Sequence, residues 1–229
     1  MHVFVMLVFI FGIGSMFGWV LEVFYRHIAD KEKRWFNPGF CVGPYLPIYG
    51  FGLVTVFLIT YLNDLTFIEN IILRRAILFI LISICLTMIE LIAGIVLLKF
   101  FNMRLWDYTD EKFNYNGFIC LKFSLFWMLL GAIYYFVIHP HVYDSVVWLS
   151  KNLIFSFFVG TFFATFVIDV IYSGNVIAKV RDYAVANGIT VAFEDLKEKV
   201  SREIKLRESK SAFFLFTFRE NLANVFKKQ

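Results

Sequence analysis

Five apolar segments, each about as long as a membrane-spanning helix, dominate this chain of 229 residues. They cover approximately residues 2–26, 45–62, 76–100, 117–138 and 150–175, with short polar stretches between them. A helix needs about 20 apolar residues to cross the hydrocarbon layer of a bilayer, and backbone polar groups inside that layer must be paired within the structure. We therefore expect an all-α, polytopic membrane protein with about five transmembrane helices.

The composition agrees with a protein surrounded by lipid. Of all residues, 60% are hydrophobic and 17% are charged, whereas soluble domains contain about 45–50% apolar and about 25% charged residues. The first apolar segment has no basic leader and exceeds the roughly 7–15 residues of a signal-peptide core, so we expect it to remain as a helix. The three cysteines have no CxxC spacing, and we expect them to be reduced.

Basic residues predict the orientation in the cell membrane. They gather in the first and third connections and in the tail, which holds eleven of the 22 Lys and Arg residues. Because Lys and Arg near span ends favour the cytoplasm, we expect the N-terminus outside and the C-terminus inside. Arg74 and Arg75 argue against this topology, because they fall on the outer side. The fourth connection, 139–144, has neither Lys nor Arg, and its two His and one Asp lack the spacing of a known metal site.

The composition changes after residue 175, where the chain becomes rich in charge. We expect two regions, a transmembrane helical bundle at 1–175 and a basic, amphipathic cytoplasmic tail at 176–229. Residues 193–207 of the tail have apolar side chains at helical spacing. The apolar stretch 212–218 is too short to span a bilayer, and we expect it to lie on the membrane or on the bundle.

Two glutamates lie within these apolar segments, Glu22 in the first and Glu90 in the third. Placing a carboxylate at membrane depth costs roughly 2.5–3.5 kcal/mol, so such a residue faces the bundle interior, a partner or water, and is a functional-site candidate. If Arg26 or Arg104 reaches Glu90, we expect a charged carboxylate. If neither does, we expect a protonated carboxyl group that donates a hydrogen bond.

The first helix carries a patterned face on which Gly14, Gly18, Glu22 and Arg26 recur every four residues. Two glycines at this spacing allow another helix to approach closely. Glu22 precedes Arg26 by one turn, which is the favourable order for an ion pair. The face is either a packing seam ended by a salt bridge or a seam that leads to a binding site.

An irregular apolar segment follows, at 37–52, and contains three of the four prolines. Proline lacks an amide donor and disfavours helical geometry in the residue before it, so we expect no regular helix here. Such backbone is tolerated at membrane depth when it is buried in protein or lines a cavity. The segment is either a rigid loop over the helix ends or a ligand-binding wall to which Tyr45 and Tyr49 add phenol groups.

Two further acids have open roles. Asp107 lies between Trp106 and Tyr108 and is either a cap for the next turn or a site acid. Asp169 lies near the cytoplasmic end of the last span, where it either belongs to the site or is simply hydrated.

Several motifs recur in combination. They are Gly18-Trp19-x-x-Glu22, Gly43-Pro44-Tyr45-x-Pro47-Ile48-Tyr49-Gly50, Glu90, Trp106-Asp107-Tyr108 and Asn116-Gly117-x-Ile119-Cys120-Leu121. Together, from about residue 12 to residue 130, they resemble the ABC-transporter type IV (CmpB-like) membrane protein family. The resemblance implies a bacterial or archaeal multispan protein that is a permease component. The chain departs from the family pattern at Pro38, where the family has Arg, and at Leu46, where it often has Cys.

The sequence thus leads to a permease-like component that binds or moves a small cationic or amphipathic solute through a cytoplasm-facing site. The candidate substrate-binding residues are Trp19, Glu22, Arg26, Pro44, Tyr45, Pro47, Tyr49, Glu90, Arg104, Trp106, Asp107 and Asp169. The partners we expect are the lipid bilayer, a small-molecule or lipid-like ligand, a separate ATPase subunit and a second copy of the chain. We expect no nucleic acid, cofactor or metal.

Two other functions fit the same residues. A membrane-embedded enzyme acting on lipid-like substrates would use Glu22, Glu90 and Asp107 in acid–base chemistry. A non-catalytic scaffold or regulator would use the polar residues to join helices. The sequence has no P-loop, G-x-S-x-G or H-E-x-x-H motif, which favours a protein that is not itself an enzyme.

Overall fold

The computed structural model describes residues 3–30, 33, 35, 37–61, 69–101, 103–186 and 191–192. Its helices are α1 (Val3–Ala29), α2 (Pro47–Tyr61), α3 (Ile71–Phe101), α4 (Leu121–Ile133), α5 (His139–Lys151) and α6 (Ser156–Ala186). A π-helical turn (Tyr134–Ile138) joins α4 to α5, and a 3-10 turn (Leu153–Phe155) precedes α6. Two short strand pairs complete the described part: β1 (Met103–Arg104) is parallel to β4 (Val191–Ala192), and β2 (Asn114–Tyr115) is antiparallel to β3 (Ile119–Cys120).

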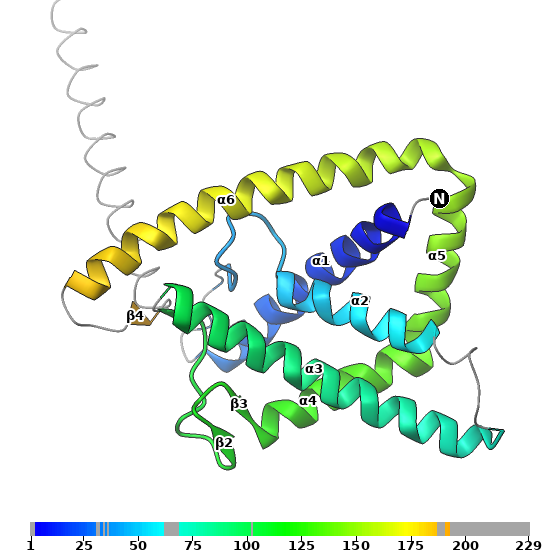
Figure 1. Cartoon of the computed structure of the whole chain (residues 1–229), viewed down its shortest axis with the longest axis horizontal. Helices are drawn as coiled ribbons and strands as arrows, with labels where there is room; N and C mark the ends of the chain where they lie inside the picture. The colour runs from blue at the N-terminus through cyan, green and yellow to red at the C-terminus, as the bar shows by residue number, and fades with distance from the viewer. Residues whose placement is uncertain are drawn as a thin grey trace, which may run out of the picture.

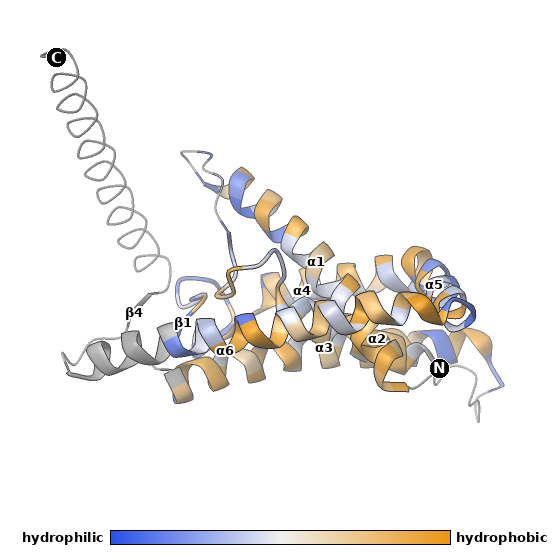
Figure 2. Cartoon of the chain, turned by 90° about the horizontal axis from the view of Figure 1, so that it is seen from above, coloured by the Kyte–Doolittle hydropathy of each residue, from blue (hydrophilic) through white to orange (hydrophobic). Residues whose placement is uncertain are grey.

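The all-α, multi-pass architecture predicted from the sequence is confirmed. Within the described ranges, four helical stretches are long and apolar enough to cross a membrane: Val3–Ala29, Ile71–Phe100, Leu121–Lys151 and Leu153–Asn175. The remaining helix, α2, has 15 residues and is therefore about 22 Å long at 1.5 Å per residue, less than the roughly 30 Å of the hydrocarbon layer. Hydrophobic residues make up much of the length of these helices (Figure 2).

The second helix is shorter than predicted because the chain before it returns along α1. The amide of Leu46 donates a hydrogen bond to the carbonyl oxygen of Ser15, at 2.9 Å, in the middle of α1. The helix then begins at Pro47, whose fixed φ suits the first helical position. The predicted irregular segment 37–52 is therefore irregular through Leu46 and helical afterwards, so its last part was predicted wrongly.

The fourth connection, predicted as a polar loop at 139–144, is instead the start of helix α5. Pro140 lies in the first turn of α5, directly after the π-helical turn Tyr134–Ile138. Val142, Val146 and Leu149 are buried, and their spacing places them on one face of the helix. The prediction failed because this apolar face packs on the bundle, while a π-helical turn and Pro140 redirect the chain.

Helices α3 and α4 lie side by side, α6 runs along the opposite edge of the molecule, and α1 and α2 lie between them (Figure 1). Helix α5 connects α4 to α6 near the N-terminus. The third connection lies at the other end, where its strand β1 pairs with β4 of the tail. Helix α6 continues to Ala186, through the boundary predicted at residue 175. The predicted tail segments 193–207 and 212–218 lie outside the described residues.

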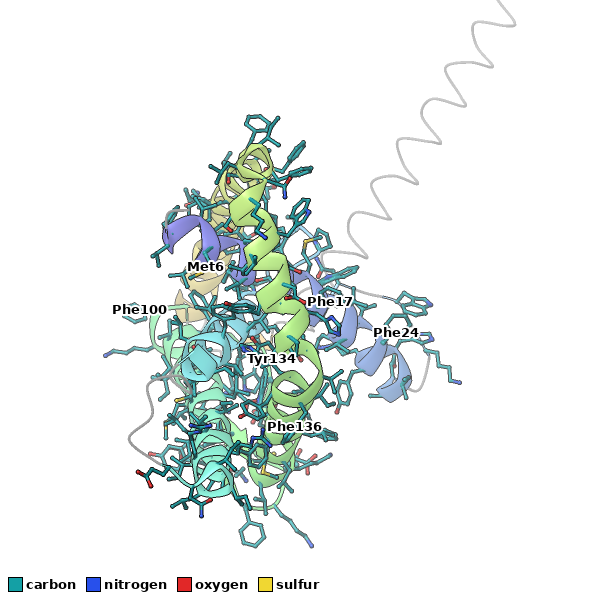
Figure 3. The ribbon with its side chains drawn as sticks, turned by 90° about the vertical axis from the view of Figure 1, so that its right-hand side faces the viewer. Met6, Phe17, Phe24, Phe100, Tyr134 and Phe136 are labelled. Carbon is teal, nitrogen blue, oxygen red and sulfur yellow. The ribbon has the colours of Figure 1, made fainter. Side chains whose placement is uncertain are left out.

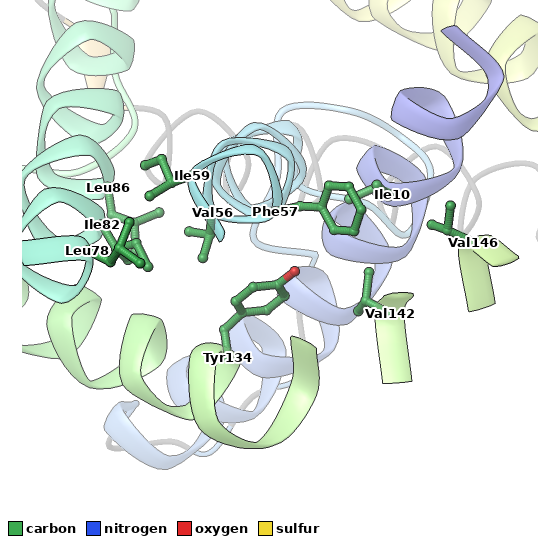
Figure 4. Close-up of a cluster of buried hydrophobic side chains, with 10 residues drawn as sticks. All are labelled: Ile10, Val56, Phe57, Ile59, Leu78, Ile82, Leu86, Tyr134, Val142 and Val146. Atoms are coloured by element: carbon green, nitrogen blue, oxygen red, sulfur yellow. The ribbon is translucent and has the colours of Figure 1, made fainter. Parts of the chain in front are cut away.

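A dry apolar core occupies the half of the bundle near the N-terminus. Its buried members are Ile10, Val56, Phe57, Ile59, Leu78, Ile82, Leu86, Tyr134, Val142 and Val146 (Figure 4). By contrast, Phe17, Phe24 and Phe136 expose 68%, 53% and 65% of their surface (Figure 3). Aromatic side chains exposed in this way suit a surface in contact with lipid.

Candidate binding site formed by two acids and aromatic side chains

Glu22 on α1 is held between a cation and a phenol. Its Oε1 lies 2.8 Å from Nε of Arg26, and its Oε2 accepts a hydrogen bond from the Tyr49 hydroxyl at 2.8 Å. A Cβ atom on Gly18 would overlap the Tyr49 ring, so glycine at this position lets α2 approach α1 closely. The predicted ion pair and the predicted close approach of a helix are both confirmed, and the approaching helix is α2.

Glu90 on α3 is buried, with 3% of its surface exposed. Its Oε1 accepts a hydrogen bond from the Tyr108 hydroxyl at 3.0 Å, and Trp127 also interacts with the carboxyl group. Burial raises the pKa of Tyr108, and the nearby carboxylates of Glu90 and Glu22 raise it further, so this hydroxyl stays protonated and donates. Oε2 of Glu90 has no hydrogen-bond partner among the residues that the structure describes.

Neither arginine that the sequence offered as a partner forms an ion pair with Glu90 in the described part of the chain. Nε of Arg26 is bonded to Glu22, and Arg104 pairs with Asp107 at 3.1 Å. The arrangement in which an arginine holds Glu90 charged is therefore not the one observed. Glu90 is buried, with the Tyr108 hydroxyl as its hydrogen-bond donor and Trp127 as a neighbour, in place of a cation.

The two acids belong to one group, which we call the acid–aromatic cluster: Glu22, Tyr49, Glu90, Tyr108 and Trp127. Tyr49 links them, because its hydroxyl bonds Glu22 while its ring lies 5.2 Å from that of Trp127. Each member comes from a different element, namely α1, α2, α3, the third connection and α4. The cluster thus depends on the packing of four helices and not on a local motif.

The loop before α2 is fixed to α1 by Asn37. The Trp19 indole donates to Oδ1 of Asn37 at 2.9 Å, and Nδ2 of Asn37 donates to the carbonyl oxygens of Cys41 and Val42 at 2.9 and 3.2 Å. The side chain of Asn37 therefore supplies hydrogen bonds that hold the loop backbone in place, as bonds between neighbouring strands do in a sheet. Trp19, one of the predicted binding residues, thus holds Asn37 in place.

Asp169 on α6 fixes the same loop from the other side. Its carboxylate accepts hydrogen bonds from the amides of Val42 and Gly43, at 3.1 and 2.8 Å, and from the Tyr45 hydroxyl. Ser173 supplies a fourth donor at 2.9 Å. Burial and the adjacent Asp169 raise the pKa of Tyr45, so its hydroxyl remains a donor. These contacts make Asp169 an anchor of the loop, separate from the acid–aromatic cluster.

The third connection contains an Asn-Gly turn that orients its aromatic residues. Asn116 and Gly117 have φ values of 51° and 73°, and the amide of Phe118 donates to the carbonyl oxygen of Tyr115 at 3.0 Å. Two consecutive positive φ values at Asn-Gly are typical of a type I′ hairpin turn. The Trp106 indole donates to the Phe118 carbonyl oxygen at 2.9 Å, which joins the two halves of the connection.

Asp107 behaves as a cap within this connection. Its Oδ1 accepts a hydrogen bond from the Thr109 amide at 3.1 Å and pairs with Arg104. The next residue, Tyr108, is fixed through its own amide, which donates to the Gly117 carbonyl oxygen at 2.9 Å. Arg104 and Asp107 therefore shape the loop that carries Tyr108 to Glu90.

The structure brings four of the twelve predicted site residues into direct contact around the acids or the linking phenol: Glu22, Arg26, Tyr49 and Glu90. The other eight shape the surrounding loops and helix starts: Trp19, Pro44, Tyr45, Pro47, Arg104, Trp106, Asp107 and Asp169. Sequence reasoning missed Asn37, Tyr108 and Trp127 as contributors. Tyr108 could have been found from its place beside Asp107, whereas Trp127 had no local signal.

The two histidines and the aspartate at 139–144 form no metal site. Within the described ranges, no group of three or more His, Cys, Asp or Glu residues is arranged to hold a metal ion. Nδ1 of His139 lies instead 3.1 Å from the Tyr134 hydroxyl, where it stabilises the turn between α4 and α5.

Of the comparisons with known proteins, the one with family models finds a match. A search of curated proteins and a search of solved structures both return no match. The family model described as "Putative ABC-transporter type IV" matches residues 9–174, which include every residue of the acid–aromatic cluster and extend the resemblance beyond residue 130. The chain is a multispan membrane protein that belongs to the ABC-transporter type IV (CmpB) family.

Proposed function

We propose that this protein is a permease component that binds a small cationic or amphipathic solute at the acid–aromatic cluster. The observation that carries the proposal is Glu90, which is 3% exposed and lies beside Tyr108 and Trp127. One of its oxygens has no hydrogen-bond partner in the described part of the chain. An acid at membrane depth is costly and is retained for a reason. A site for cations is the reason that best fits these neighbours.

The charges around the two acids support a cationic solute. Arg26 compensates Glu22, whereas Glu90 has no ion pair among the described residues. A bound cation, or a proton in its absence, would supply the missing positive charge. Tyr and Trp rings attract cations through their faces, and this attraction is worth about 2 kcal/mol or more when the site is dry.

We further propose that the site opens toward the cytoplasm. The first and third connections carry the basic residues that favour this side, and Tyr108 belongs to the third connection. On this proposal, residues 1–175 form the membrane bundle and 176–229 a cytoplasmic tail. Because the sequence contains no P-loop motif, nucleotide hydrolysis would come from a separate subunit.

The proposal is tested by equilibrium binding to the purified protein in lipid nanodiscs. The probes are a panel of radiolabelled primary and quaternary organic amines and their neutral alcohol counterparts. We expect at least one amine to bind, and Glu90→Gln to weaken that binding at least about tenfold, because removing one partner of a buried charge pair costs about 2–5 kcal/mol. The exposed Glu69 supplies the control substitution Glu69→Gln, which should leave binding unchanged.

The same assay separates the rival functions. Amine binding that survives Glu90→Gln would overturn the proposal. Loss of thermal stability in Glu90→Gln, with no amine bound by the unsubstituted protein, would instead support a scaffold. Product formed from lipid extracts by the purified protein would support an enzyme.

A further inference from the structure

We propose that Asp169 is the latch that holds the loop at 37–46 closed, and that α6 controls the acid–aromatic cluster through this latch. The inference rests on the proposed function for its biological meaning, because it identifies what regulates access to that site. The latch itself is a property of the fold and is tested without any solute.

The contacts of Asp169 are concentrated on one short stretch of the loop. Three of its four hydrogen-bond donors are the Val42 amide, the Gly43 amide and the Tyr45 hydroxyl, which lie more than 120 residues away in the sequence. Hydrogen bonds to a charged group are about twice as strong as neutral ones. A single side chain of α6 therefore accepts hydrogen bonds from loop amides that belong to neither a helix nor a sheet.

The other contacts between α6 and the bundle are easier to replace. Phe163 packs on Phe4 with ring centroids 5.4 Å apart, and Phe166 packs on Phe11 at 5.1 Å. In a bilayer, lipid chains are as apolar as these side chains, so apolar contact alone contributes little to helix association. Helix α6 lies along one edge of the molecule (Figure 1). Tyr45 of the loop also packs its ring on Phe162 and Phe166 of α6, at 6.0 and 5.4 Å, so the latch is the polar part of the connection between this helix and the loop.

The loop leads directly to the cluster. Tyr45 is buried, the Leu46 amide is bonded to α1, and helix α2 begins at the next residue. Within the first turn of α2, Tyr49 bonds Glu22. A change in the position of Val42–Tyr45 is therefore transmitted over a few residues of chain to the phenol that links the two acids.

The strand that follows α6 in the sequence also contacts the third connection, which carries Tyr108. Strand β4, which follows α6, pairs with β1, and β1 leads into the connection that carries Tyr108. A movement of α6 would act on Tyr49 through Asp169 and the loop. Asp169 is accordingly a positioning residue, and its effect on the site passes through the loop.

Cys41 provides a direct reporter of the latch, because it lies in the loop and is 2% exposed. The experiment uses the full-length protein in nanodiscs with Cys85→Ala and Cys120→Ala, and measures the rate at which Cys41 reacts with a water-soluble maleimide. We expect Asp169→Ala to raise this rate at least about tenfold, since it removes several charge-assisted hydrogen bonds. Tyr45→Phe should raise it less, because it removes one.

Two controls separate loop opening from general unfolding. Ser173→Ala removes a donor to Asp169 that comes from α6 itself, so it should leave the Cys41 rate unchanged. In a protein whose one remaining cysteine is Cys120, which is 1% exposed in β3, Asp169→Ala should not increase labelling. Asp169→Glu should restore part of the protection of Cys41.

The latch would be overturned if Asp169→Ala left the Cys41 rate unchanged, or if Cys41 and Cys120 became reactive together. Either result is independent of whether amines bind at Glu90. Conversely, failure of amine binding in the unsubstituted protein would remove the proposed function while leaving the latch in place.

Discussion

The two halves of the bundle share helices α1, α2 and α3 but differ in the chemistry of the side chains that meet in them. Near the N-terminus, helices α1, α2 and α3 meet α5 around Ile10, Phe57 and Ile82, all of them buried. Toward the other end, α1, α2 and α3 meet α4 around Glu22, Tyr49 and Glu90. One half is close-packed and apolar, whereas the other holds two acids and their hydrogen-bonding partners.

This difference indicates how stability and function are divided along the helices. The apolar half needs shape complementarity alone, so its side chains are replaceable by others of similar volume. The polar half needs particular donors at particular atoms, because a buried polar group without a partner is costly. Substitutions in the apolar half should therefore change stability, and substitutions in the polar half should change stability and binding together.

The largest loss of stability is expected in the apolar half, from Ile82→Ala. Ile82 is fully buried, and truncation of a buried Ile costs about 2–5 kcal/mol because a cavity remains. The measurement is the free energy of unfolding in mixed micelles. The control is Ile80→Ala on the same helix, where 57% of the side chain is exposed and little change is expected. Equal losses for both would show that the apolar core is misplaced.

The next largest effect is expected from Tyr49→Phe in the polar half. The substitution keeps the ring beside Trp127 but removes the hydrogen bond to Glu22, and a bond to a charged group contributes about 1.5–3 kcal/mol. Tyr172→Phe, at an exposed tyrosine, should have no measurable effect on unfolding. If Tyr49→Phe also left the free energy of unfolding unchanged, Tyr49 would not link the two acids.

Smaller changes in the free energy of unfolding are expected from alanine substitutions at two glycines, and the two changes should have opposite signs. A Cβ on Gly18 would overlap the Tyr49 ring, so Gly18→Ala should destabilise the protein by about 1–3 kcal/mol through overpacking. A Cβ on Gly160 would meet nothing within 4 Å, so Gly160→Ala should instead stabilise α6 by about 0.5–1 kcal/mol. Unfolding measurements that gave both substitutions the same sign would contradict the close approach of α1 and α2.

The sequence predicted those parts of the molecule that depend on local spacing. The ion pair between Glu22 and Arg26 follows from a separation of four residues on one helix, and membrane-length helices follow from apolar runs. Tyr108 could have been proposed from its place beside Asp107, but its contact with Glu90 could not, because Tyr108 lies in a loop, and Trp127 comes from another helix with no local signal at all. Such contacts depend on how helices pack, which spacing in a single sequence does not specify.

Helix α5 shows a different limit of prediction from sequence. The helical spacing of its apolar residues was present, but neighbouring residues favoured a loop. Val142, Val146 and Leu149 recur at helical spacing, yet Pro140 and the polar residues around it favoured a loop. The short helix α2 shows the opposite error, since an apolar run of spanning length includes two residues that are not helical. Composition predicted a membrane segment at 45–62 and a polar connection at 139–144, and tertiary packing decided the form of both.

The central claim is that Glu22 and Glu90 act as one cluster. A double-mutant cycle on the free energy of unfolding, with Glu22→Gln, Glu90→Gln and the two combined, tests it most directly. Residues in one network give coupling energies of about 0.5–3 kcal/mol, and we predict a value in this range, because Tyr49, Tyr108 and Trp127 lie between the acids. Additive effects, with a coupling energy below about 0.3 kcal/mol, would show two independent sites and contradict the account.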